Sequence, residues 1–89
     1  MTIDLTSQFR RVFRKRISGK PTEALFNSKL EVFIEDPFSS SLKTHKLSGK
    51  FQGSWAFSVA YDCRIIFQFT DDTHEKVLFL TIGSHDEVY

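Results

Sequence analysis

The side chains best suited to chemistry in this sequence are histidines and one arginine. His45 and His85 each lie beside the end of a predicted strand, where side chains from different strands can gather on one face. Histidine exchanges protons near neutral pH, so two of them can serve as general base and general acid. Taken singly, each is more often a surface or packing residue. His74 lies among acidic residues in a predicted turn and is expected to be a solvated surface residue.

Arg64 opens a predicted strand at residues 64–67, so its side chain is expected on the face opposite Ile65 and Phe67. An arginine held on a strand can bind a phosphate through two parallel hydrogen bonds. The alternative is an ordinary exposed strand arginine, and the sequence favours neither interpretation.

We expect no metal and no cofactor. No two histidines have the i, i+4 spacing of a helical metal site, and Cys63 is the only cysteine, so no Cys-x-x-Cys pair exists. A single cysteine cannot form an internal disulfide, which favours a reducing compartment, and the expected location is the cytoplasm. No apolar run approaches the roughly 18 residues that span a bilayer, so no membrane partner is expected.

The chain of 89 residues is long enough for one domain, expected over residues 1–89, and too short for two. The formal net charge is only +1, yet residues 1–20 carry +5 and residues 21–42 carry −3. These cations either form the solvated face of a helix or contact nucleic-acid phosphates, and the same surface suits an acidic partner segment. The basic candidates for RNA binding on this face are Arg10, Arg11, Arg14 and Lys15.

Two helices are expected first. Phe9, Val12, Phe13 and Ile17 have helical spacing, with a cap at Thr6 or Ser7 and a stop at Gly19. A second helix begins at Pro21 and ends before Asp36-Pro37, and the two are expected to form an antiparallel hairpin.

The period then changes to two, which predicts strands at residues 55–61, 64–69 and 77–82. An additional strand is expected at residues 44–47 and a short first strand at residues 1–5. Helices followed by strands indicate an α+β domain.

Four segments in this order resemble the RelE/ParE superfamily of bacterial type II toxins, nearest to its RelE-like and YafQ-like branches. They are His45-Lys46-Leu47-Ser48-Gly49, Gly53-Ser54-Trp55, Arg64-Ile65-Ile66-Phe67-Gln68-Phe69 and Gly83-Ser84-His85-Asp86-Glu87-Val88-Tyr89. The resemblance implies two N-terminal helices in a hairpin packed on a twisted antiparallel sheet of about four strands. It also implies cleavage of mRNA in the ribosomal A site, so the expected partners are a cognate antitoxin, the ribosome and mRNA.

By the same resemblance, Arg64 matches a phosphate-contacting arginine and His85 a catalytic histidine of YafQ-like members. Tyr89 matches a functional aromatic residue, and His45 an upstream histidine of the YafQ-like branch. Lys46 and Lys50 are expected to replace basic residues of RelE-like members in binding RNA.

These residues suggest metal-free cleavage through the 2′-OH of RNA. His45 and His85 would act as the acid–base pair, Arg64 would stabilise charge on the phosphate, and Tyr89 would stack on a base or orient the phosphate. Two other functions stay open: a ParE-like gyrase inhibitor, in which this set of residues has no obvious role, and a degenerate module that binds antitoxin without catalysis, which the low net charge favours.

Overall fold

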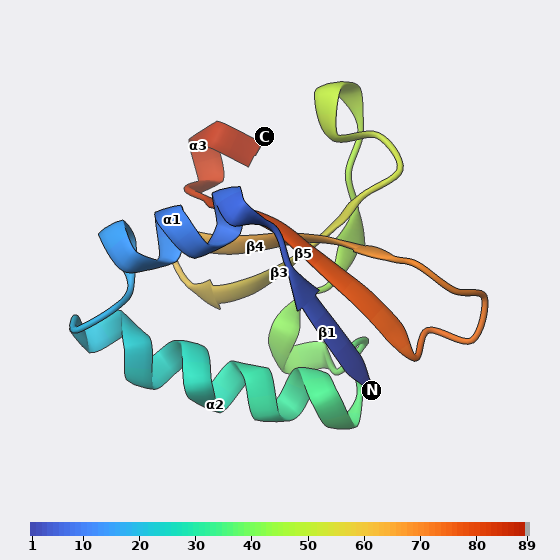
Figure 1. Ribbon diagram of the computed structural model, residues 1–89, viewed down its shortest axis with the longest axis horizontal. Helices are drawn as coiled ribbons and strands as arrows, with labels where there is room; N and C mark the ends of the chain where they lie inside the picture. Colours follow the sequence, from blue (N-terminus) through green and yellow to red (C-terminus); the bar gives the residue numbers. More distant parts are fainter. Residues whose placement is uncertain (89) are drawn as a thin grey trace.

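The computed structural model describes residues 1–88 and has an α+β architecture built on one five-stranded sheet (Figure 1). The strands are β1 (Thr2–Leu5), β2 (His45–Lys46), β3 (Trp55–Ala60), β4 (Cys63–Phe69) and β5 (Lys76–Gly83). The helices are α1 (Ser7–Arg16), α2 (Pro21–Glu35) and α3 (His85–Val88), with 3₁₀ turns η1 (Ser40–Leu42) and η2 (Gly49–Phe51).

Local signals in the sequence explain where the long helices begin and end. The hydroxyl of Thr6, one of the two predicted caps, accepts a hydrogen bond from the backbone N–H of Phe9 at the start of α1. Pro21 occupies the first turn of α2, where its missing N–H costs nothing. The helix ends at Glu35, ahead of Asp36-Pro37, because a proline disfavours helical geometry in the residue before it.

The sheet has the order β1-β5-β4-β3-β2, and its pairing corrects two expectations. It has five strands where about four were expected, and it is mixed where an antiparallel sheet was expected, since β1 runs parallel to β5. Alternation of side chains locates a strand but does not identify its partner, and β1 pairs with residues more than seventy positions away. The Thr6 hydroxyl fixes this junction by donating to the carbonyl oxygen of Leu80 (2.6 Å).

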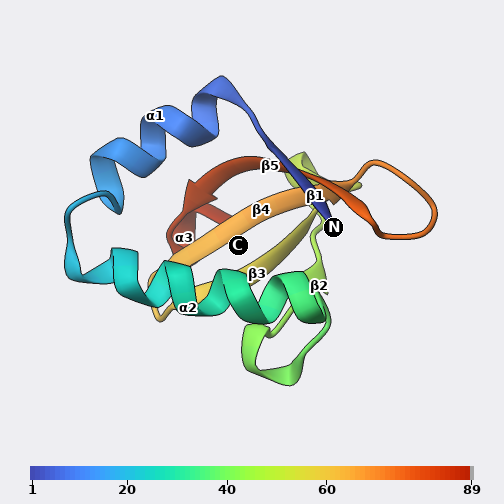
Figure 2. The ribbon, with the colours of Figure 1, turned by 60° about the horizontal axis from the view of Figure 1, so that its bottom comes forward.

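The two long helices follow one another as expected, but they diverge and do not lie side by side as an antiparallel hairpin. Helix α1 packs against β5 and α2 packs against β3, on the same side of the sheet (Figure 2). The helices meet through Phe13 and Phe26, whose ring centroids are 5.1 Å apart. An apolar groove of about 430 Å³ lies between them, beside β1.

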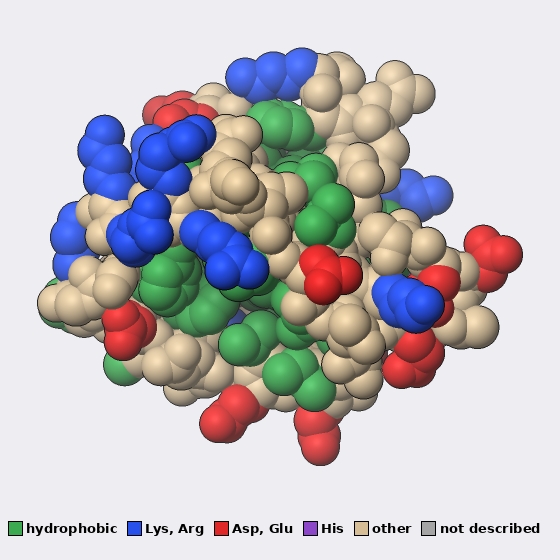
Figure 3. All heavy atoms as spheres, in the orientation of Figure 1, with side chains coloured by type: hydrophobic (Ala, Val, Ile, Leu, Met, Phe, Trp, Pro, Cys, Tyr) green, Lys and Arg blue, Asp and Glu red, His purple; other side chains and the backbone are tan. Residues whose placement is uncertain are grey.

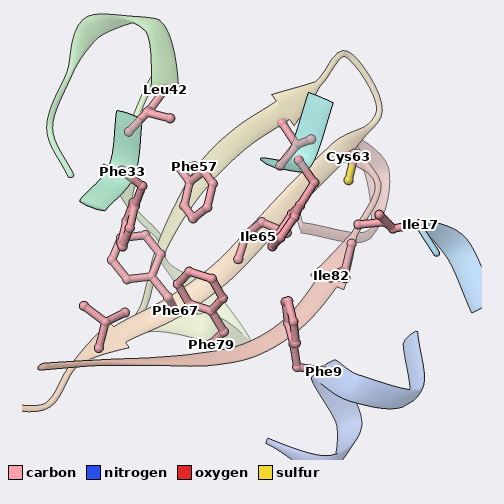
Figure 4. Close-up of a cluster of buried hydrophobic side chains, with 13 residues drawn as sticks. Phe9, Ile17, Phe33, Leu42, Phe57, Cys63, Ile65, Phe67, Phe79 and Ile82 are labelled. Atoms are coloured by element: carbon pink, nitrogen blue, oxygen red, sulfur yellow. The ribbon is translucent and has the colours of Figure 1, made fainter. Parts of the chain in front are cut away.

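Phenylalanine rings fill the core between the helices and the sheet (Figure 4). Phe33 of α2 lies 4.7 Å from Phe57 and 5.0 Å from Phe67, measured between ring centroids, and Phe79 closes the cluster at 5.6 Å from Phe33. All four side chains are almost completely excluded from solvent. The many aromatic residues thus let a short chain fill its core with few side chains.

The opposite face of the sheet carries a smaller apolar cluster, composed of Leu47, Ala56, Ile66 and Val88. A bulge in β5 helps to build it: Ile66 pairs with Thr81 and Phe67 with Phe79, so Leu80 is the additional residue. Leu80 packs against this second cluster, whereas Ile82 joins the core. Helix α3 therefore covers the second face, opposite α2 (Figure 1). No helix within residues 1–88 is long and apolar enough to cross a membrane.

Candidate functional site

A pocket of about 650 Å³, here called the α3 pocket, lies on the second face of the sheet between α3 and the segment that begins with β2. His45, Lys46 and Lys50 line one side, and residues 86–88 of α3 line the other. The pocket therefore combines one predicted catalytic histidine with two predicted RNA-binding lysines. It faces the helix that also carries His85.

His45 lies in β2, where it pairs with Ala56 of β3. Its ring nitrogen Nδ1 is 2.8 Å from the carbonyl oxygen of Lys43. Because a carbonyl oxygen only accepts, Nδ1 must carry the hydrogen of this bond. The neutral ring then has its lone pair on Nε2, the form that a general base requires.

Arg64 lies near the start of β4, paired with Ser58 of β3 on one side and Gly83 of β5 on the other. Its Nη1 donates to the Ser58 hydroxyl (3.2 Å), the Ala60 carbonyl (2.6 Å) and the Tyr61 carbonyl (2.8 Å). Within residues 1–88, the hydrogen bonds of this guanidinium all use Nη1. The group is thus fixed against the β3–β4 turn, with the donors of Nη2 and Nε on its other edges.

The same turn holds the beginning of α3. The Asp62 carboxylate accepts a hydrogen bond from the backbone N–H of His85 (3.2 Å), and Gly83, two residues before His85, pairs with Arg64. Two predicted catalytic residues are thereby tied to one turn. The His85 side chain is 56% exposed, and its Nδ1 lies 3.7 Å from a carboxylate oxygen of Asp86, an ion pair only when the ring is protonated.

Three further residues, Ser84, Glu87 and Arg16, hold α3 in place, and the sequence predictions gave none of them this role. Ser84 and Glu87 form a reciprocal cap: the Ser84 N–H donates to the Glu87 carboxylate (2.7 Å), and the Glu87 N–H donates to the Ser84 hydroxyl (3.2 Å). Arg16, the last residue of α1, donates two hydrogen bonds to the Glu87 carboxylate (2.6 and 3.0 Å). The Ser-x-x-Glu spacing is a sequence signal for such a cap, whereas the contact with Arg16 joins residues 71 positions apart.

The ion pair shifts both titrations. Hydrogen bonds from Arg16, and then from the Ser84 N–H, lower the pKa of Glu87 to about 2 from its ordinary 4.5. The bonds to Glu87 in turn raise the pKa of Arg16. The pair therefore stays charged at every pH at which the protein would work.

The remaining predicted residues lie elsewhere. Arg10 and Arg14 border the apolar groove on the helix-covered face, and Arg11 and Lys15 are exposed on α1; Figure 3 shows basic side chains gathered over α1 beside apolar ones. None of the four lines the α3 pocket. Tyr89 lies outside the described residues. Residues 1–88 hold no group of three or more His, Cys, Asp or Glu able to bind a metal ion.

The whole chain matches the model of a known protein family. The model of the bacterial toxin of type II toxin–antitoxin systems, YafQ, matches residues 1–89. The chain belongs to the YafQ toxin family. It is thus a toxin of a type II toxin–antitoxin system with a RelE-like fold. A search of curated proteins gives no match.

Solved structures of related toxins share the fold of this YafQ-family chain. Escherichia coli YafQ is 20% identical with a TM-score of 0.71, covering 98% of this chain and 96% of that one. A chain of the E. coli DinJ–YafQ complex is 21% identical with a TM-score of 0.65, covering 98% of this chain and 96% of that one. A YoeB/ParE toxin from Agrobacterium tumefaciens is 15% identical with a TM-score of 0.74, covering 96% of this chain and 99% of that one.

Proposed function

We propose that this toxin is a ribosome-dependent mRNA endonuclease that cleaves RNA through the 2′-OH without a metal. The observation that carries the proposal is the second face of the sheet, where His45, Lys46 and Lys50 line a pocket against α3. His85 and Arg64 do not line this pocket; both are bound to the β3–β4 turn, and His85 directly precedes the residues of α3 that line it. A base, an acid and fixed positive charge are the groups that such a cleavage needs.

His45 suits the role of general base. Its Nδ1–H bond to the Lys43 carbonyl leaves the lone pair on Nε2 in the neutral ring. Nε2 takes the proton of the 2′-OH, the 2′-oxygen attacks phosphorus, and a bond from phosphorus to the 2′-oxygen forms. The bond from phosphorus to the 5′-oxygen breaks, leaving a 2′,3′-cyclic phosphate on the upstream fragment.

His85 suits the role of general acid, because a protonated imidazole can give its proton to the departing 5′-oxygen. Its backbone N–H is held by the Asp62 carboxylate at the β3–β4 turn. In this scheme Tyr89 would stack on a base or orient the phosphate, as expected from the sequence.

Arg64 suits the stabilisation of charge on the phosphate. Three hydrogen bonds fix Nη1, so the guanidinium needs little further ordering when RNA binds. Its Nη2 and Nε donors form an edge that matches two phosphate oxygens. Lys46 and Lys50 add positive charge along the α3 pocket, where the RNA backbone would lie.

We further propose that a cognate antitoxin binds the helix-covered face. The E. coli relative is found in complex with DinJ, and a YoeB–YefM complex from Staphylococcus aureus has a similar chain. The apolar groove offers Phe13, Leu30 and Leu5 beside Arg10 and Arg14. An acidic amphipathic segment would match both its apolar floor and its basic border.

A gyrase inhibitor is the second candidate, because one structural neighbour is described as a YoeB/ParE toxin. Primer extension on cellular mRNA after induction of the toxin separates the two. We expect cuts in phase with codons, and we expect them to disappear in His85→Ala. Growth arrest with intact mRNA would favour gyrase inhibition, and normal growth without the antitoxin would favour a non-catalytic binding module.

A further inference from the structure

Four aromatic rings gather at the end of β4 that is remote from α3. His74, in the β4–β5 turn, stacks on Phe69 with ring centroids 4.0 Å apart and an interplanar angle of 21°. Trp55 lies edge-on to Phe69 at 5.8 Å, and Phe38 lies edge-on to Trp55 at 5.3 Å. His74 is solvent-exposed, as expected from the sequence, but its ring extends an aromatic surface.

These rings border a second pocket, here called the aromatic pocket, of about 680 Å³. It lies between the segment after β2 and the β4–β5 turn, both at the right of Figure 1. Trp55, Phe69 and His74 supply apolar ring surface. Polar groups suited to base edges come from Ser48 and Gln52. The size falls within the range of about 300–1,000 Å³ that holds small organic groups.

Trp55 and Phe69 also pack against the edge of the main core, and two details distinguish this cluster from ordinary core packing. The Lys46 ammonium lies 5.4 Å from the centroid of the Trp55 ring, so a cation stands beside the rings. His74 has a φ of +60°, a left-handed conformation that is uncommon for residues other than glycine, although histidine is one of those that adopt it more often. Backbone held in this way is often found at ligand-binding sites. Rings with an adjacent cation are the features that bind bases and phosphates of single-stranded nucleic acid.

The aromatic pocket adjoins the α3 pocket. Lys46, Leu47 and Ser48 line both, so the two pockets lie on either side of one short segment. An RNA strand with its scissile phosphate in the α3 pocket would pass Lys46 and reach Trp55 and His74.

We propose that the aromatic pocket binds a base of single-stranded RNA next to the cleaved nucleotide, by stacking with the Trp55–Phe69–His74 rings. The neighbouring position rests on the proposed nuclease function, whereas the stacking itself does not. Lys46 would contact the phosphate between the two nucleotides. Stacking accepts any base, so this pocket would contribute affinity with little sequence preference.

Trp55 makes the test direct because it is the only tryptophan in the chain. The wild-type protein is titrated with a short single-stranded oligonucleotide whose 2′-deoxy sugars prevent cleavage, and the intrinsic fluorescence is recorded. We expect saturable quenching. An abasic oligonucleotide of equal length, which keeps the phosphates, should bind about fivefold or more weakly, since stacking on aromatic residues contributes about 1–3 kcal/mol per base. Equal binding of the two would overturn the proposal.

His74→Ala removes one ring without opening the core, and it should weaken binding of the oligonucleotide by about fivefold or more. His74→Phe keeps a flat ring and should bind nearly as tightly as the wild type, which a merely structural effect of the turn would not explain. Unchanged affinity in His74→Ala would refute the assignment. A thermal melt of both variants checks their folding.

Cleavage of unmodified RNA on ribosomes, assayed in parallel, separates failure of this proposal from failure of the nuclease. Quenching by the oligonucleotide without any cleavage would uphold the stacking site and reject the nuclease. Cleavage by a protein whose Trp55 fluorescence does not respond to the oligonucleotide would uphold the nuclease and reject the stacking site.

Discussion

At the scale of single residues, the candidate site depends on side chains whose orientation is fixed before RNA arrives. Arg64 is bound to the Ser58 hydroxyl and to two carbonyl oxygens of the β3–β4 turn, and His45 is bound to a carbonyl oxygen that sets its tautomer. Groups ordered in advance stabilise a transition state without the cost of reorganisation. Loss of one such group should therefore lower the rate of cleavage more than the affinity for RNA.

Replacement of Arg64 tests this expectation. Arg64→Ala should lower the single-turnover rate of mRNA cleavage on ribosomes by about 10²–10³-fold, as for other fixed donors to a transition state. Arg64→Lys should restore only part of the rate, because an ammonium cannot both bind the turn and present a planar edge to the phosphate. Ser58→Ala, which leaves both carbonyl partners in place, is the matched control and should cleave at close to the wild-type rate. A wild-type rate in Arg64→Ala would exclude this role.

At the scale of elements, the position of α3 determines whether His85 can reach the site. A helix of four residues is unstable alone, so its position depends on outside contacts. The Ser84–Glu87 cap, the Arg16–Glu87 ion pair and the burial of Val88 supply them. The ion pair links the last turn of α1 to the C-terminal helix.

The titration of Glu87 reports on this link. Because folding lowers the pKa of Glu87, the stabilising effect of the pair is complete above the ordinary value of 4.5 and is lost as pH falls toward 2. Carboxyl chemical shifts in an NMR titration should give a midpoint of about 2 in the wild type. Arg16→Met should move the midpoint toward 4.5. Lys15→Met, which removes a neighbouring cation of α1, should leave it near 2; the same midpoint in all three proteins would refute the link.

The sequence predicted features that depend on neighbouring residues better than features that depend on contacts between distant segments. The Thr6 cap, the start at Pro21 and the alternation in β3 depend on neighbouring residues, and these predictions are confirmed. The parallel β1–β5 pair, the bulge at Leu80 and the divergence of α1 from α2 depend on contacts between distant segments, and those were missed or wrong.

The same distinction applies to the site. Placing His45 and His85 beside strand ends followed from local pattern. The partners Arg16, Asp62 and Glu87 become visible only when the chain is folded, apart from the Ser-x-x-Glu spacing. The catalytic roles of the predicted residues stay predictions.

At the scale of the whole molecule, the proposed antitoxin groove and the α3 pocket lie on opposite faces of the sheet. The apolar groove with Arg10 and Arg14 is on the helix-covered face, and the α3 pocket is on the other. The groove has a basic border, whereas the α3 pocket sets Lys46 and Lys50 opposite Asp86 and Glu87, in keeping with a net charge of only +1. Antitoxin and RNA would be recognised by different parts of the surface.

Charge reversal on α1 tests whether the antitoxin binds at the apolar groove. The double variant Arg10→Glu/Arg14→Glu reverses the border of the apolar groove and should weaken binding of the cognate antitoxin by about tenfold or more, measured by calorimetry. Arg11→Glu/Lys15→Glu makes the same change in charge on helix positions that do not line the groove, and it should weaken binding much less. Equal losses in the two double variants would show that only the overall charge matters.

The central claim is that the RNA supplies its own nucleophile, and one substitution in the RNA tests it most directly. An mRNA on the ribosome is cut by the purified toxin, the cut site is mapped, and the nucleotide immediately 5′ of the cut is then replaced by its 2′-deoxy form. We predict that cleavage at that bond stops and that the unmodified RNA yields a 2′,3′-cyclic phosphate end. Continued cleavage of the deoxy-substituted bond would contradict the mechanism, whichever side chains act as base and acid.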